Sequence, residues 1–199
     1  GNIIWQKTYV GSGYHYAYGV VQTSDNGYMI VGSVYSYYGG RNFSVIKVDQ
    51  SGNPVWAKIY DYYYYDDIAR DIKVVDNYSY VISGNNIVFK IDQYGNIVWQ
   101  KKYSAGEIYD IEITKDHRYI AVTSNGYVMK IDRFGNLYGC YSDFVHNVSL
   151  VMNNLTIFTI GYTIYTMDTP GNTVSTQSNT YLPSLSSIIA CYFQALGIV

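Results

Sequence analysis

The sequence is poor in charge and has no long apolar run. Charged residues make up 14% of its 199 residues, and the formal net charge is −2. So few charges argue against a disordered chain, and the near-neutral balance argues against a nucleic-acid partner, which needs a basic face. The most apolar stretch, residues 186–199, is too short to span a bilayer and contains Gln194. We therefore expect no membrane span, and we interpret this stretch as a core or interface strand.

Cysteine is also scarce. The two cysteines, Cys140 and Cys191, are too few for a disulfide framework. They are compatible with one disulfide bond in an oxidising compartment, or with two small buried apolar side chains. An N-terminal signal peptide is lacking as well, and the chain does not begin with Met. Because Gly1 opens directly on a repeated segment, we expect a processed protein or an excised fragment.

Tyrosine is the most unusual part of the composition, with 26 residues beside only 3 prolines. Tyr, Ile, Val and Thr suit a pleated, half-buried surface, so the composition predicts an all-β protein. Four sequons for N-glycosylation also occur, and together with the low charge they favour an extracellular surface. Their acceptor residues are Asn42, Asn77, Asn147 and Asn154.

One phrase recurs along the chain. GNIIWQKTY at residues 1–9 returns as GNPVWAKIY at 52–60 and as GNIVWQKKY at 95–103. Fainter copies begin at Gly135 and Gly171. Repeats of roughly 40–50 residues, each with four short strands, are typical of the blades of a β-propeller.

Each unit divides into the same strands. The first strand runs apolar or alternating, as expected of a buried strand, and covers residues 18–23, 68–75, 108–114 and 145–152. The second follows a tight polar turn and covers residues 28–34, 80–83, 119–124 and 155–161. The third covers residues 43–49, 87–92, 127–132 and 163–168.

A turn of the form Asp-x-x-Gly-Asn joins the third strand to a fourth strand that carries tryptophan. The Asp carboxylate can accept hydrogen bonds from turn amides, and the Gly supplies a positive φ. We expect the Trp side chain to dock against the next blade, so these residues predict structure and not chemistry. The docking residues are Trp5, Trp56, Trp99, Asp49, Asp92 and Asp132.

The unit xVxKIDxxGNxVWxKxY resembles the repeat of the quinoprotein-like, tryptophan-docking β-propellers and the short propeller repeats of secreted and surface proteins of archaea and bacteria. The resemblance covers residues 1–179. It implies one all-β propeller domain over residues 1–199, built from four-stranded antiparallel blades. Members that bind a quinone cofactor add calcium ligands and a vicinal cysteine pair. Neither is recognisable in this sequence, so we expect no cofactor and no metal.

The number of blades is open between three arrangements. A ring of five blades, the last incomplete, would use repeats at about 1–51, 52–94, 95–134, 135–170 and 171–199. A ring of four blades with an extra C-terminal strand is the runner-up, and an open piece of a larger propeller is the third. In a closed ring, residues 1–9 would supply the outer strand of the last blade, which removes exposed sheet edges.

The long loops fall on one face and are rich in tyrosine. They cover residues 10–16, 35–42 and 61–67, whereas the opposite face has tight turns. Function tends to sit on long loops of a rigid scaffold, and Tyr offers contact area and a hydroxyl group at low entropic cost. We interpret this face as a binding site for a protein or a glycan; the alternative is that Tyr is simply the default surface residue. The candidates are Tyr14, His15, Tyr16, Tyr37, Tyr38, Arg41, Tyr63, Tyr64, Tyr65, Asp66 and Asp67.

No catalytic residue is identified. Asp61, Asp66 and Asp67 suit a cation or an acid–base pair, but carboxylates in such a loop are more often solvated turn residues. We therefore favour a non-enzymatic propeller on the outside of a cell or a virion, since the composition resembles surface and virion proteins of hyperthermophilic archaea and their viruses. The alternatives are a glycan-active hydrolase or lectin that uses the same face, and a segment of a larger surface assembly joined through its terminal strands.

Overall fold

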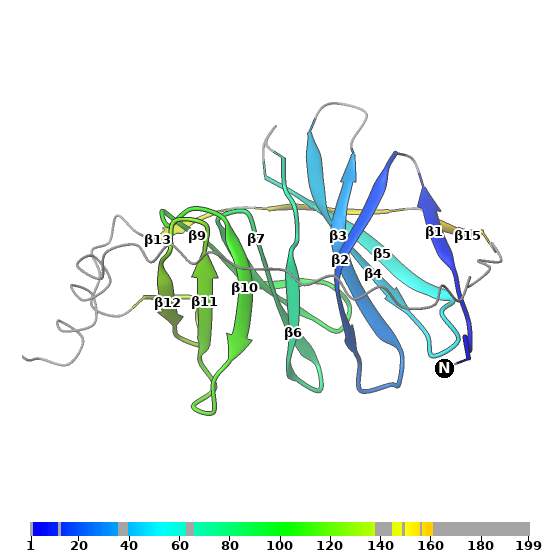
Figure 1. The fold of residues 1–199 in the computed structure, drawn as a ribbon, viewed down its shortest axis with the longest axis horizontal. Helices are drawn as coiled ribbons and strands as arrows, with labels where there is room; N and C mark the ends of the chain where they lie inside the picture. Colours follow the sequence, from blue (N-terminus) through cyan, green and yellow to red (C-terminus); the bar gives the residue numbers. More distant parts are fainter. Residues whose placement is uncertain are drawn as a thin grey trace, which may run out of the picture.

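In the computed structural model, the described residues are 2–11, 13–35, 40–62, 66–137, 145–148, 150–155 and 157–160. They form antiparallel sheets, and none of them lies in a helix. The all-β prediction is therefore confirmed. No helix long and apolar enough to cross a membrane occurs in this part of the chain. The three larger sheets follow one another along the long axis of the molecule in sequence order (Figure 1).

The first sheet is a meander of four consecutive strands with a fifth strand added. It contains β2 (His15–Gln22), β3 (Tyr28–Tyr35), β4 (Arg41–Val48) and β5 (Pro54–Asp61), and β14 (Val151–Asn154) pairs with the outer edge of β5. Strand β4 is buried along almost its whole length, whereas β2 is mostly exposed. The burial of β4, which includes the polar residues Asn42, Ser44 and Lys47, thus marks the middle of the sheet.

The second sheet repeats this plan. It contains β6 (Asp71–Asp76), β7 (Ser79–Gly84), β8 (Ile87–Asp92) and β9 (Ile97–Tyr103), and β13 (Val145–Asn147) pairs with the outer edge of β9. Every residue of β7 is buried, which agrees with a sheet that is packed on both faces.

The third sheet contains three strands of the next unit. They are β10 (Ile108–Ile113), β11 (Tyr119–Thr123) and β12 (Val128–Ile131), and a single bridge joins Ile131 to Leu137 where the fourth strand of the unit would begin. In each of the first three units the first, second and third predicted strands are therefore present, with their ends moved by a few residues. The predicted outer strand at residues 1–9 is instead β1 (Thr8–Gly11).

Neighbouring sheets pack against each other through two apolar clusters. Between the first and second sheets, the ring centroid of Phe89 lies 5.4 Å from that of Phe43 and 5.1 Å from that of Tyr60. Between the second and third sheets, Val81 packs in one buried cluster with Tyr119. The inner strands β2, β6 and β10 also contact one another in sequence order. Each fully buried side chain of this size stabilises the fold by roughly 1.5–3 kcal/mol.

A tryptophan from each unit lies on the glycine turn of the next sheet. A Cβ atom at Gly52 would be 3.0 Å from the Trp5 ring, and one at Gly95 would be 2.9 Å from the Trp56 ring. Both glycines have positive φ, +75° and +78°. The same arrangement joins Trp99 to the third sheet, where Gly135 has φ +85°. The turn therefore requires glycine for its backbone and for the flat surface that the indole covers.

Each of these turns is closed by its aspartate, and a tyrosine completes the contact between sheets. Asp92 Oδ1 accepts hydrogen bonds from the backbone amides of Tyr94 and Asn96 at 2.9 and 2.8 Å, and Asp49 and Asp132 bind their own turns in the same way. The Tyr60 hydroxyl then donates to the Gly95 carbonyl at 2.7 Å. Tyr9 and Tyr103 make the equivalent bonds on the other turns.

The fourth unit departs from the prediction. Residues 145–152, predicted to be an inner strand, instead supply β13 and the start of β14 on the outer edges of the second and first sheets. Residues 155–161, predicted to be a second strand, supply β15 (Ile157–Ile160), which pairs with β1 (Thr8–Gly11). An outer strand leaves unpaired N–H and C=O groups, and this segment satisfies them. The N-terminal strand thus finds a partner, but the described residues form no closed ring of sheets. Residues 163–168, 171–199 and both cysteines lie outside the described residues.

Substitution of Gly95 tests the tryptophan contact. We expect Gly95→Ala to lower the free energy of unfolding by about 2–5 kcal/mol, since it adds about 1–2 kcal/mol of positive-φ strain and about 1–3 kcal/mol of overpacking against Trp56, Lys58 and Tyr60. Gly126→Ala is the matched control because Gly126 has φ +77° but nothing within 4 Å of its Cβ position. Urea unfolding of both variants measures the difference, and equal losses would contradict a packing role for Trp56.

Candidate functional site

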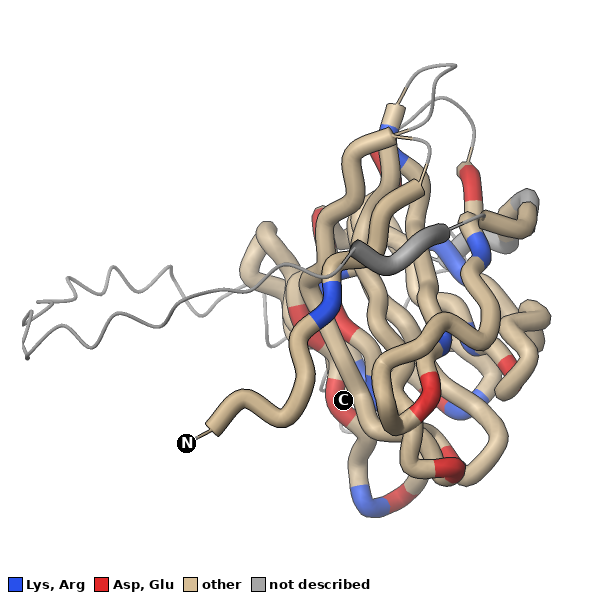
Figure 2. The backbone as a smooth tube through the Cα atoms, turned by 90° about the vertical axis from the view of Figure 1, so that its right-hand side faces the viewer, with Lys and Arg blue, Asp and Glu red and all other residues tan. Residues whose placement is uncertain are grey.

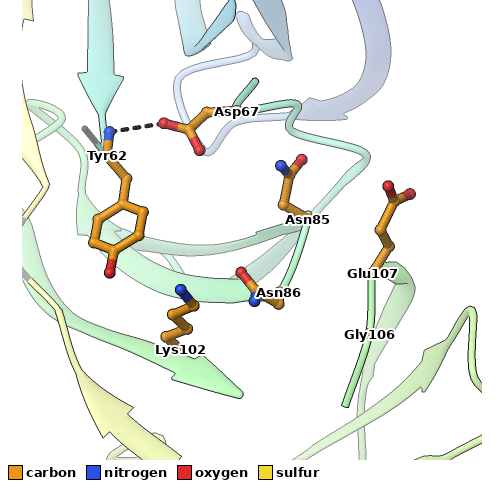
Figure 3. A pocket seen from close by; sticks show the side chains of 7 residues that line it. All are labelled: Tyr62, Asp67, Asn85, Asn86, Lys102, Gly106 and Glu107. Carbon is orange, nitrogen blue, oxygen red and sulfur yellow. Dashed lines mark hydrogen bonds between the residues drawn. The ribbon is translucent and has the colours of Figure 1, made fainter. Parts of the chain in front are cut away.

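Three connections meet around a pocket of about 360 Å³. They are the segment between β5 and β6, the β7–β8 turn with the end of β9, and the segment between β9 and β10. Their side chains converge on the pocket from several directions in Figure 3. The lining residues are Tyr62, Asp67, Asn85, Asn86, Lys102, Gly106 and Glu107.

Asp67 is the most buried charged side chain of the pocket. It is 1% exposed, and its Oδ2 accepts a hydrogen bond from the Tyr62 backbone amide at 2.7 Å (Figure 3). Burial raises the pKa of Asp67 to about 7, and the nearby charges of Asp61 and Asp66 act in the same direction. The Tyr62 amide and Lys102 oppose this shift of the pKa. Asp67 is thus a carboxyl group poised between its neutral and its charged form near neutral pH.

Lys102 and Tyr62 contact each other in the lining of the pocket. The Lys102 Nζ atom lies 4.9 Å from the centroid of the Tyr62 ring, within range of a cation–π interaction. Lys102 stands near the end of β9, where the corresponding residues of the other units are Thr8 and Ile59. It is therefore a charge that the repeat itself does not require.

Asn85 connects the β7–β8 turn to the β5–β6 connection through hydrogen bonds of its side-chain amide. Its Oδ1 accepts a hydrogen bond from the Ile68 amide at 2.9 Å, and its Nδ2 donates to the Asp66 carbonyl. Asn85 has φ +47°, a conformation that Asn tolerates better than most residues. The amide group of Asn85 is thus committed to the β5–β6 connection, so it positions the pocket.

The rim of the pocket is tied to the third sheet. The Glu107 carboxylate pairs with the Arg70 guanidinium at 2.9 Å, and the Glu107 amide donates to the Ser124 hydroxyl at 3.0 Å. Arg70 also lies 5.2 Å from the centroid of the Tyr109 ring. Glu107 remains half exposed, so it presents a hydrogen-bond acceptor at the mouth of the pocket.

Arg41 brings several of the predicted binding residues together in the structure. Its guanidinium lies 5.2 Å from the Tyr16 ring centroid, and its amide donates to Asp66 Oδ1 at 2.8 Å. Its carbonyl accepts a hydrogen bond from the Asp67 amide at 2.6 Å. Tyr16, Arg41, Asp66 and Asp67 are thus brought together by these contacts. Tyr37, Tyr38, Tyr63, Tyr64 and Tyr65 lie outside the described residues.

Tyr14 and His15 differ strongly in their surroundings. Tyr14 is 77% exposed, whereas both ring nitrogens of His15 are buried without a hydrogen-bond partner. Burial lowers the pKa of His15, because the charged imidazolium is disfavoured away from water. Tyr14 is therefore available to a partner, and His15 is not placed as an exposed binding residue.

Sequence reasoning missed most of the pocket. It identified Asp67 but not Tyr62, Asn85, Asn86, Lys102, Gly106 or Glu107. The β7–β8 turn looks like ordinary turn chemistry, and Gly106 and Glu107 lie in a short connection without a pattern. The one available signal was Lys102, the second lysine of the third repeated phrase.

The opposite end of the sheets is held by ion pairs at equivalent positions. Lys47 pairs with Asp25 at 2.9 Å and Lys130 with Asp116 at 2.9 Å. Charged residues of both signs are interspersed along the backbone in Figure 2. Together with Lys90, which lies 3.9 Å from Asp76, these recurring lysines serve the turns.

The four sequons have different surroundings. Asn42 is 5% exposed within β4, so the folded protein has no room for a glycan there, and its modification stays a prediction that burial disfavours. Asn77 and Asn154 are exposed. Asn147 lies in β13, and its side chain is outside the described set.

No protein-family model matches the chain, and no curated protein matches it in sequence. In the part of the chain that the structure describes, no group of three or more His, Cys, Asp or Glu side chains could hold a metal ion. The site is therefore defined by its own geometry: a polar pocket with one buried carboxyl group, one lysine and one aromatic ring.

Asp67 gives the stability of the protein a specific pH dependence. Its folded-state pKa, about 7, lies above the ordinary value of 3.8, so the folded state binds this proton more tightly than the unfolded state. Stability then falls as the pH rises through this interval, by up to about 4 kcal/mol. We expect Asp67→Asn, which keeps an acceptor for the Tyr62 amide, to remove this fall in urea unfolding between pH 5 and 8. Glu107→Gln is the matched control and should keep the wild-type slope; a wild-type slope in Asp67→Asn would contradict the assignment.

Exposure predicts which sequons carry glycans in a secreted product. Expressed with a secretion signal in a eukaryotic host, the folded protein should carry glycans at Asn77 and Asn154 and none at Asn42, because a chain with a glycan at the buried Asn42 could not complete the first sheet. Peptide mass spectrometry after enzymatic glycan release in ¹⁸O-labelled water reads each site. Substantial occupancy of Asn42 in the folded fraction is the result that would refute this.

Proposed function

We propose that the chain is a section of a β-propeller of the tryptophan-docking type and that it binds an uncharged polar ligand of the glycan class, without catalysis. The observation that carries the binding proposal is the pocket around Asp67, which combines a buried carboxyl group, Lys102 and the Tyr62 ring. The propeller proposal is supported by the meander order of successive sheets, their contacting inner strands and the tryptophan contacts between them.

The chemistry of the pocket suits a ligand rich in hydroxyl groups. Glu107 and a neutral or charged Asp67 supply acceptors, Lys102 supplies donors, and Asn86 adds an amide that can do both. The charges of Lys102 and Asp67 oppose each other, and Arg70 offsets Glu107. A strongly charged ligand would therefore gain little net electrostatic attraction from the pocket, whereas the hydroxyl groups of a sugar can form hydrogen bonds with both the donors and the acceptors.

The placement of the carboxyl groups argues for binding over hydrolysis. A glycosidase requires two carboxyl groups that reach the scissile bond from opposite sides. Asp67 lines the pocket, but Asp66 does not and accepts a hydrogen bond from the Arg41 amide, while the other lining carboxylate, Glu107, is paired with Arg70. The two aspartates favoured by sequence thus serve the connection between the sheets.

A protein partner on the first sheet is the second candidate. Tyr14, Tyr16 and Tyr35 are 77%, 46% and 48% exposed and lie at one end of neighbouring strands β2 and β3. Exposed tyrosines at this density favour a protein contact. We place either activity outside the cell, on a cell surface or a virion, and the exposed acceptors Asn77 and Asn154 support that location.

A glycan array tests the proposal directly. The labelled protein should bind a restricted set of glycans, and Lys102→Ala should weaken binding at least tenfold, since a hydrogen bond to a charged group contributes roughly 1.5–3 kcal/mol. Lys115→Ala, at an exposed turn on the opposite end, is the control and should bind as the wild type does. Binding to no glycan, or equal binding by both variants, would exclude the pocket as a glycan site.

A further inference from the structure

Residues 145–148, 150–155 and 157–160 lie along the outer edges of the sheets, and we call them the outer strap. Its strands β13, β14 and β15 pair in turn with β9, β5 and β1, always antiparallel. In Figure 1 it is the yellow trace that crosses behind the sheets. The three edges that it covers belong to the same segment of the repeated unit, the one that begins with the Gly-Asn-x-x-Trp phrase.

The strap meets each edge in the same register. Val145 lies opposite Tyr103, Met152 opposite Tyr60, and Thr159 opposite Tyr9. The three tyrosines are the last residue of the repeated phrase, and their partners in the strap are seven residues apart. The strap therefore advances by one seven-residue unit for each sheet.

The amino-acid sequence of the strap has the same step. Asn147-Val-Ser-Leu is followed seven residues later by Asn154-Leu-Thr-Ile. Val148 packs on the cluster between the first two sheets, and Leu155, seven residues later, packs on the cluster that contains Ile46. Leu150 is also buried in the first of these clusters. One apolar anchor per unit thus accompanies a short ladder of main-chain hydrogen bonds.

In the part of the strap whose contacts the structure describes, hydrogen bonds of the strap's own main chain tie it to the edges. The Leu150 amide donates to Gln100 Oε1 at 3.1 Å and the Leu155 amide to the Ala57 carbonyl at 2.8 Å. Among the side chains that the structure describes, no ion pair joins the strap to a sheet. Because main-chain pairing carries little sequence specificity, and because both the units and the edges repeat, an edge does not distinguish its own unit from an equivalent one.

We propose that the outer strap is exchangeable between copies of this chain, so that the strap of a second copy docks on the β9, β5 and β1 edges and joins the two molecules. This is strand exchange of an identical element, the route by which a repeated edge most readily gives self-assembly. It is independent of the pocket and of any ligand there.

A cysteine pair across β5 and β14 detects the exchange. Lys58 lies opposite Asn154, and the hydrogen bond of the neighbouring pair, Leu155 to Ala57, makes this a non-hydrogen-bonded pair with Cα atoms about 4.5 Å apart, within disulfide range. Both native cysteines are first changed to Ser. The Lys58→Cys variant is then mixed with the Asn154→Cys variant under mild oxidation, at increasing protein concentration.

We expect a disulfide-linked heterodimer that grows with concentration on a non-reducing gel, and an intramolecular bond in the dilute double variant. Asn77→Cys mixed with Lys58→Cys is the control, since Asn77 sits in the β6–β7 turn; it should give no specific product. If the mixture stays monomeric, or links no better than the control, the strap is held within one chain and the proposal fails. Should Lys58→Cys not fold, Asn147→Cys and Lys101→Cys form the equivalent facing pair on β13 and β9.

Discussion

The contact of an indole ring with a glycine turn is the constraint on which this structure depends. Trp56 and Tyr60 from one sheet both reach Gly95 of the next, and Asp92 shapes the turn that presents this glycine. The contact needs a positive φ and the absence of a Cβ atom at the same residue, so only one amino acid serves. The same solution at each boundary fixes the spacing of successive sheets, and it explains why the most repetitive residues of the chain carry no chemistry of their own.

A fixed spacing of the sheets turns the connections between them into a site. The pocket is lined by segments that link the first sheet to the second and the second to the third, together with the β7–β8 turn. Asn85 joins two of these segments by hydrogen bonds to Ile68 and Asp66. The repeated part of the sequence therefore fixes the arrangement of the sheets. The residues that differ between units, such as Lys102, supply the charged and polar groups of the pocket.

Periodicity predicts the first three units well because each carries its own docking phrase. It fails for residues 145–152, whose apolar pattern suits an inner strand and an outer one equally. The preceding phrase has Gly139 where the earlier ones have Trp5, Trp56 and Trp99, so the anchor that fixed the earlier units is missing, and the open edges of β9 and β5 capture the segment. Asp67 was recognisable as a candidate from its loop. Its hydrogen bond with Tyr62 was not, because the donor is a backbone amide, which every residue except proline has.

The protonation state of the buried Asp67 carboxyl group bears on the class of ligand that the pocket can bind. An unpaired carboxylate is costly to bury, so the site lowers this cost by holding the group close to its neutral form. In that form Asp67 can donate as well as accept a hydrogen bond, which a permanently ionised aspartate cannot do. A ligand with hydroxyl groups can satisfy either form, whereas a cation would draw Asp67 into its charged form and an anion would meet three nearby aspartates. The electrostatics of the pocket thus favour the same uncharged, polar class of ligand as its lining.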